Sequence, residues 1–88
     1  MPALHAFVFG KVQGVFYRGF VEECANQLGL GGWCKNVFDG SVEVWAEGEK
    51  GKLDKLLEAL QKGPNSARVE RVEAKWKESQ GFRTFSVQ

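Results

Sequence analysis

Four leucines in the second half of this 88-residue chain give its clearest structural signal. Their spacing of i, i+3, i+4 and i+7 is typical of one face of a helix, and they are Leu53, Leu56, Leu57 and Leu60. This helix is predicted over about residues 52–62, because a Gly-Pro pair follows it. A second amphipathic pattern predicts a helix over Gly19–Leu28, with Gly29 after its end. Each helix has one apolar face, and both are expected to cover the same face of a sheet.

Between the two predicted helices, an Asp-Gly pair predicts a β-hairpin. A three-residue loop, Phe38–Gly40, pairs Lys35 with Glu43 and Trp33 with Trp45. Opposite charges and aromatic rings then face one another across the strands. A two-residue loop brings neither pair together. We therefore predict the three-residue loop, with its glycine in the left-handed conformation.

The same register gathers small apolar side chains on one face of the hairpin, as a core requires. These side chains are Cys34, Val42, Val44 and Ala46. Asn36 is expected on this inner face too, at the C-terminal end of its strand.

Three further segments are predicted strands. Leu4–Gly10 alternates between two sets of side chains. Ala67–Trp76 is a longer strand in which Val69 and Val72 break the alternation, and this break favours a bulge. Phe82–Val87 is a candidate for a short edge strand.

The element order is strand, helix, strand, strand, helix, strand, which predicts an α+β fold of the ferredoxin-like type. In this split β-α-β sandwich (βαββαβ), two helices cover one face of an antiparallel sheet. The first two strands run parallel, with another strand between them, so their C-terminal ends meet at the same sheet edge. We therefore expect the turn after the first strand to lie close to Asn36.

Length and composition limit the class of protein. We expect one domain, residues 1–88, and 43% hydrophobic with 12% aromatic residues argues against disorder. Twelve Lys and Arg against 11 Asp and Glu argue against nucleic acids or anionic membranes as partners. The sequence shows neither an apolar run of about 20 residues nor a signal peptide. Two Cys without an export signal indicate the cytoplasm.

A glycine-punctuated segment, Gly10–Arg18, joins the first predicted strand to the first helix. Unpaired N–H groups and the helix dipole favour an anion at such a helix N-terminus. Arg18 stands at the junction, where its guanidinium can bind two oxygens of a phosphate or carboxylate. On this pattern alone, an ordinary turn with a surface arginine is the alternative. Asn36 carries a carboxamide that can hold a water, and its alternative role is to cap backbone within the hairpin.

Three segments resemble signatures of the acylphosphatase family. Gly10–Arg18 reads GKVQGVFYR and closely resembles G-x-V-Q-G-V-x-F-R. Gly32–Glu43 reads GWCKNVFDGSVE and is similar to G-W-V-x-N-x-x-D-G-x-V-E, while Gly63–Val69 matches G-P-x-x-A-x-V. The resemblance covers essentially the whole chain. Its departures are small, since Tyr17 stands where the family usually has Phe, and Cys34 where it has Val.

The resemblance implies hydrolysis of acyl phosphates, the mixed anhydrides of carboxylic and phosphoric acids, without metal or cofactor. It implies that Arg18 and the loop amides bind the phosphate, and that Asn36 orients the attacking water. The loop residues carried over are Gln13, Gly14, Val15, Phe16 and Tyr17. The expected partner is a small-molecule acyl phosphate, with inorganic phosphate as product and inhibitor. The expected state is a monomer.

Hydrolysis of an acyl phosphate requires few catalytic groups from a protein. The leaving carboxylate has a conjugate acid with a pKa of about 4, so it departs without a protonating general acid. Phosphoryl transfer needs positioning and neutralisation of phosphate charge, which fixed amides and one guanidinium supply. No strong general base is evident, and we hypothesise that a phosphate oxygen of the substrate takes the proton of the water.

Other chemistry-bearing residues are given structural roles. His5, the only histidine, alternates onto the outward face of the first strand and is interpreted as a plain surface residue. Cys24 and Cys34 fall on apolar faces and are interpreted as small core residues. Glu22 and Glu23 are interpreted as solvated charges near the helix start. No set of His, Cys, Asp and Glu has metal-ligand spacing.

Two other function classes stay open at this stage. RNA-recognition modules share this topology and stack bases on sheet aromatics; here the outward aromatics are Phe7, Phe9, Trp33 and Trp45. The net charge of +1 and the lack of the RNA-binding sequence motif argue against that role, although these aromatics could support a dimer. The second alternative is a regulatory domain that keeps the fold without turnover, against which the intact Arg18 and Asn36 argue.

Overall fold

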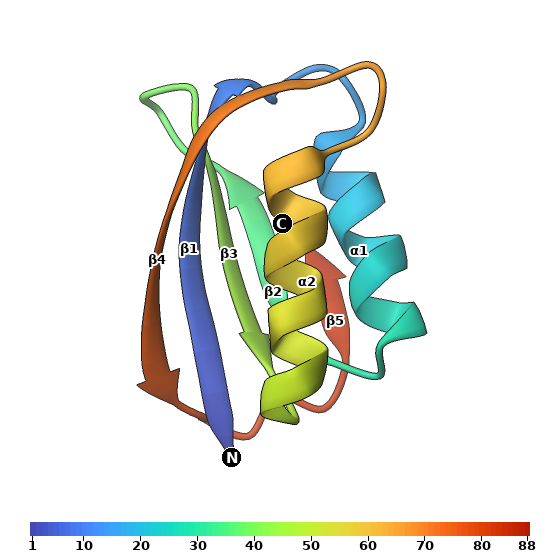
Figure 1. Cartoon of the computed structure of the whole chain (residues 1–88), viewed down its shortest axis with the longest axis vertical. Coiled ribbons are helices and arrows are strands. Elements are labelled where there is room, and N and C mark those ends of the chain that lie inside the picture. Colours follow the sequence, from blue (N-terminus) through green and yellow to red (C-terminus); the bar gives the residue numbers. More distant parts are fainter.

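Two helices lie side by side on one face of a five-stranded sheet, as Figure 1 shows. The computed structural model describes all residues, 1–88. In chain order the elements are β1 (Pro2–Lys11), α1 (Tyr17–Gln27), β2 (Gly31–Asn36), β3 (Val42–Glu47), α2 (Lys50–Lys62), β4 (Arg68–Glu78) and β5 (Phe85–Val87). This arrangement confirms the predicted ferredoxin-like plan, to which β5 adds an edge strand.

The strand order in the sheet is β4-β1-β3-β2-β5. The first four strands pair antiparallel, whereas β5 pairs parallel with β2, so the complete sheet is mixed. Because β3 lies between them, β1 and β2 point the same way. The β1–α1 loop and the β2–β3 hairpin therefore lie at one end of the molecule, together with the α2–β4 loop (Figure 1).

The hairpin has the predicted register. Trp33 faces Trp45 and Lys35 faces Glu43. The loop closes through two backbone hydrogen bonds and contains Gly40 at a left-handed φ of 92°. Cross-strand pairing of charge and ring, rather than the turn residues alone, thus identified the right loop length.

The predicted irregularity in the last long strand is a bulge opposite the end of β1. Phe9 faces Arg71, but Gly10 faces Val69, so Glu70 is left without a partner. Gly10 has a φ of 131°, and a Cβ atom there would lie 2.1 Å from a carbonyl oxygen of β4. Only glycine fits this position, and the bend directs the chain from β1 into the following loop.

The core lies between the helices and the inner sheet face. Leu53, Leu56 and Leu60 are fully buried and Leu57 is half-buried, which confirms the leucine pattern.

The helices begin earlier than predicted, α2 at Lys50 and α1 two residues before Gly19. Neither helix has the length and apolar character that a membrane crossing requires.

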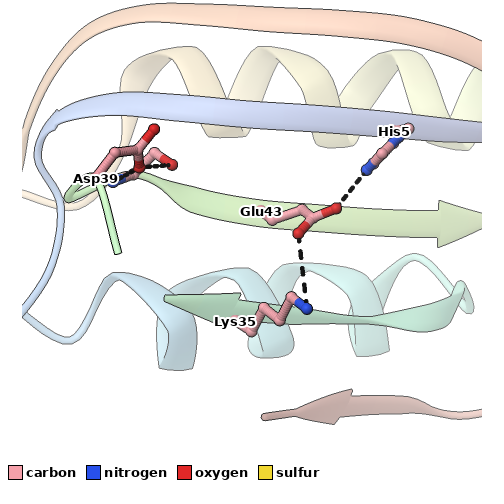
Figure 2. Close-up of polar contacts among 5 residues, drawn as sticks. His5, Lys35, Asp39 and Glu43 are labelled. Atoms are coloured by element: carbon pink, nitrogen blue, oxygen red, sulfur yellow. Dashed lines mark hydrogen bonds and ion pairs between the residues drawn. The ribbon is translucent and has the colours of Figure 1, made fainter. Parts of the chain in front are cut away.

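On the outer sheet face, one glutamate links three strands (Figure 2). Nε2 of His5 lies 2.6 Å from Oε2 of Glu43, and Nζ of Lys35 lies 3.9 Å from the other carboxylate oxygen. The His5 ring also packs near Phe7 and Trp45, with centroid distances of 5.1 and 5.3 Å. The interpretation of His5 as a plain surface residue is therefore wrong, because it is half-buried and bonded across strands.

At the other end of β3, a buried carboxylate holds the β4–β5 connection. Glu47 is 5% exposed and accepts a hydrogen bond of 2.7 Å from Nε1 of Trp45. It also accepts the amides of Gln80, Gly81 and Phe82 at 2.6, 3.0 and 3.0 Å. Burial by itself raises the pKa of Glu47, but these four donors outweigh it and leave that pKa below its ordinary value.

Candidate functional site

The β1–α1 loop, residues 12–16, presents a run of free backbone amides. None of the amides of residues 13–19 donates a backbone hydrogen bond. Gly14 and Phe16 both have left-handed backbones, with φ of 76° and 64°, and Phe16 is the N-cap of α1 without a side-chain cap bond. Such a run at a helix N-terminus forms a concave nest of donors for an anion. The geometry is the one expected from the glycine pattern of this segment.

Side-chain hydrogen bonds fasten this loop to its neighbours. The Nε2 amide of Gln13 donates to the carbonyls of Val37 and Ser41 in the β2–β3 hairpin, at 2.7 and 2.9 Å. The hydroxyl of Ser66, in the α2–β4 connection, donates to the carbonyl of Val15 at 2.7 Å. Loop and hairpin are thus held as one unit. The side chain of Gln13 is committed to the hairpin, so only its backbone amide is free for a ligand.

Tyr17 anchors the first turn of α1 in the core. Its side chain is 1% exposed, and its hydroxyl donates to the carbonyl of Leu60 in α2 at 2.7 Å. The hydroxyl that distinguishes this residue from Phe therefore has the partner that a buried polar group requires. Burial raises the pKa of Tyr17, and the neighbouring Cys24 and Cys34 add to the shift. It stays a neutral donor at physiological pH.

Arg18 lines a cavity of about 310 Å³ beside the loop. Its Nη1 atom donates to the main-chain oxygen of Gln88 at 2.6 Å, and its guanidinium makes no other hydrogen bond within the chain. Most of its five N–H groups are thus available to a ligand. Arg18 is the only cation that lines this cavity, which also contains Glu22 one turn further along α1. The arginine is therefore held beside the nest rather than standing alone on the surface.

Asn36 ends β2, opposite Val42, and is exposed. The next residue, Val37, receives the hydrogen bond from Gln13, which brings the end of β2 against the loop as predicted. The carboxamide of Asn36 makes no hydrogen bond within the chain, and the hairpin is capped instead by Asp39, which accepts the amide and hydroxyl of Ser41 at 2.9 and 2.6 Å (Figure 2). The alternative role of Asn36 as a hairpin cap is therefore wrong. Asn36 is not among the residues that line the cavity of Arg18.

The two cysteines differ in burial, but burial raises the pKa of both thiols. Cys34 is fully buried, and its thiol lies 3.7 Å from the carbonyl of Arg18, to which it donates. Burial raises the pKa of Cys34 to about 12, although Arg18 lowers it. Cys24 is half-buried, and burial raises its pKa too. Both thiols stay protonated at neutral pH, as their interpretation as small core residues requires. No group of three or more His, Cys, Asp and Glu side chains is placed to hold a metal ion.

Three fastening elements were missed by reasoning from the sequence. They are the Gln13 side chain, the Ser66 side chain and Gln88, which follows β5 and accepts a hydrogen bond from Arg18. The polar character of Gln13 and Ser66 was visible, but their partners are 24 to 51 residues away in sequence. Only the tertiary structure shows these contacts.

Comparison with known proteins agrees with the fold. The sequence model of the acylphosphatase family matches residues 4–87. The chain is 51% identical to an acylphosphatase of Thermus thermophilus over 87 residues, with 99% of each chain covered. It is 48% identical to one of Deinococcus radiodurans over 84 residues, with 96% of this chain and 97% of the relative covered. The crystal structure of acylphosphatase from Bacillus subtilis matches with a TM-score of 0.96 and 36% identity, covering 100% of this chain and 99% of that one. The chain therefore belongs to the acylphosphatase family.

Proposed function

We propose that this enzyme hydrolyses acyl phosphates to a carboxylate and inorganic phosphate. The loop amides and Arg18 bind the phosphate, Asn36 orients the water, and no metal or cofactor takes part. The observation that carries the proposal is the run of unpaired amides of residues 13–19, with a single arginine beside it. Family membership supports the substrate class.

The nest and Arg18 supply what a phosphate needs. The free amides aim partial positive charge at one point, and the helix N-terminus adds to it. Because Gln13 and Ser66 tie the loop to two neighbouring segments, the donors are fixed before the substrate arrives. Preorganised donors stabilise charge that develops in the transition state without reorganisation at that moment. The planar fork of Arg18 matches two phosphate oxygens.

The reaction can be balanced without further groups. Water attacks phosphorus, the bond between phosphorus and the acyl oxygen breaks, and the electron pair leaves with the carboxylate. The carboxylate is a weak base, so no acid has to protonate it. The proton of the water passes to a phosphate oxygen, which gives inorganic phosphate.

Asn36 is assigned to the water because its carboxamide is free and lies at the strand end beside the loop. An amide can accept from a water while it donates to a phosphate oxygen, and so fixes the line of attack. A thiolate nucleophile is disfavoured, because burial keeps the thiol of Cys34 protonated.

The wider setting is proposed on the same grounds. We take residues 1–88 as one domain that acts as a monomer in the cytoplasm on small-molecule substrates. Inorganic phosphate, as the product, is expected to inhibit by occupying the nest.

Hydrolysis of benzoyl phosphate with and without EDTA tests the proposal. We expect turnover at the same rate in both. Loss of turnover in EDTA that a divalent cation restores would overturn the metal-free mechanism. Absence of turnover in both conditions would overturn the enzymatic function and favour a regulatory domain with the same fold.

A further inference from the structure

Phe16 combines three features that the binding of phosphate alone does not explain. Its side chain is 66% exposed. It is the only non-glycine residue in the chain with a positive φ, at 64°, a conformation that residues with a Cβ rarely adopt. It also lines the same cavity as Arg18. A backbone amide could be presented there by a glycine, so the exposed ring itself needs a reason.

The ring of Phe16 rests against the first turn of α1. A Cβ atom added to Gly19 would lie 2.2 Å from Cε1 of this ring and 2.4 Å from Cζ. Gly19 thus leaves the space that the ring occupies. The exposed ring therefore packs on Gly19 beside the cavity rather than facing solvent on all sides.

The remaining lining shows what part of a substrate would meet this ring. Arg18 is the only cation of the cavity, and the phosphate takes it together with the amides. Val12 and Tyr17 also line the cavity, but each is only 1% exposed. The accessible apolar surface therefore comes from Phe16 and from Val87, which is 39% exposed. In an acyl phosphate, one bridging oxygen separates phosphorus from the acyl carbon, so the acyl group lies within reach of this surface.

We propose that the Phe16 ring is the platform for the acyl group and makes the enzyme prefer aromatic acyl phosphates to small aliphatic ones. This inference rests on the proposed function. A ring in this position can contact an aromatic acyl group by stacking or edge-to-face packing, whereas an acetyl group is too small to cover it. Aromatic pairs of this kind correspond to about 3- to 10-fold in an equilibrium or rate ratio, beyond the burial of area.

Phe38 provides a matched control. It is also an exposed phenylalanine at the same end of the molecule, in the β2–β3 hairpin, but it does not line the cavity. A general effect of losing an exposed ring would appear equally at both positions. If the Phe16 ring binds the acyl group, only substitution at Phe16 changes the preference between the two substrates.

The test is the ratio of kcat/KM for benzoyl phosphate to kcat/KM for acetyl phosphate. Any disturbance of the nest lowers both values and cancels in this ratio. We expect Phe16→Asn, which tolerates the left-handed backbone, to lower the ratio about 3- to 10-fold. Phe16→Tyr, which keeps a ring, and Phe38→Asn should keep the ratio of the natural protein. Gly19→Ala keeps Phe16 but fills the space under its ring, and should lower the ratio as well.

The outcomes separate the inference from the proposed function. If the natural protein hydrolyses both substrates and the ratio is the same in Phe16→Asn and Phe38→Asn, the platform role is wrong while the function stands. If Phe16→Asn does not fold, the ratio in Gly19→Ala decides in the same way. If the natural protein hydrolyses neither substrate, the function itself is wrong, and the inference falls with it.

Discussion

Replacing Glu47 by Gln is expected to destabilise the fold without contacting the β1–α1 loop of the candidate site. The carboxylate is 5% exposed, and its two oxygens each accept two hydrogen bonds. A glutamine offers one oxygen and one NH2 group. In either orientation, two of the four donors then face another donor instead of an acceptor.

The size of the loss follows from these four bonds. Two hydrogen bonds to a charged group disappear, each with a net value of about 1.5–3 kcal/mol, and the lower desolvation of an amide offsets part of this. We expect the free energy of unfolding to fall by about 2–4 kcal/mol. For a domain of this size, each kcal/mol lowers Tm by about 4–8 °C. The loss is thus a large share of a stability that is typically about 5–15 kcal/mol.

The stabilising effect also has a defined pH range. The pKa of Glu47 is lowered in the folded state, so the unfolded state binds more protons as the pH falls. The contribution is complete above the ordinary glutamate pKa of about 4.3 and is lost as the pH falls through the lower folded value. The difference between Glu47→Gln and the natural protein should therefore shrink in acid.

Urea unfolding followed by circular dichroism at pH 7 and pH 3 measures both effects. Glu78→Gln, at an exposed position on edge strand β4, is the matched control and should change stability little. A loss below about 1 kcal/mol for Glu47→Gln at pH 7 would show that the four bonds contribute no more than an ordinary surface contact.

The remaining predictions concern the loop and its supports. Arg18→Gln should weaken phosphate binding and turnover together, and Arg18→Lys should restore little because it lacks the planar fork; steady-state kinetics and phosphate inhibition measure both. Asn36→Ala should lower kcat about 10²-fold or more with nearly unchanged phosphate affinity, and a loss of affinity with kcat retained would instead make Asn36 a phosphate ligand. Tyr17→Phe should lower the unfolding free energy by about 0.5–1.5 kcal/mol, because it leaves the Leu60 carbonyl without its partner; an unchanged urea midpoint would contradict this.

Periodicity and pairing chemistry predicted most of the fold. The leucine spacing of α2, the hairpin register and the bulge opposite Gly10 are all local patterns that packing reinforces. The start of α1 was predicted too late, because Phe16 ends the preceding loop with a left-handed backbone that the sequence pattern does not indicate. His5 was misread because its partner Glu43 lies on another strand, 38 residues away.

The candidate site, too, was predictable from local patterns but not where it depends on long-range contacts. The glycines and Arg18 indicated a candidate anion site, because a strand-to-helix turn leaves amide donors unpaired. On that pattern alone an ordinary turn stayed open, and the family resemblance decided between the two. Topology alone brought Asn36 to the same sheet edge. The sequence could not show that Gln13 directs its side chain to the hairpin, that Gln88 holds Arg18, or that Gly19 makes room for the Phe16 ring. These contacts join segments far apart in the chain or depend on one backbone angle.

Titration of the 15N-labelled protein with inorganic phosphate, followed by amide NMR, tests the central claim most directly. The account predicts saturable shifts that are largest at the amides of residues 13–19 and at the side chain of Arg18, because these donors have no partner within the chain except for one bond to Gln88. Saturable shifts centred elsewhere, for example on Lys50 and Lys52 at the start of α2, with the loop amides unmoved, would contradict it.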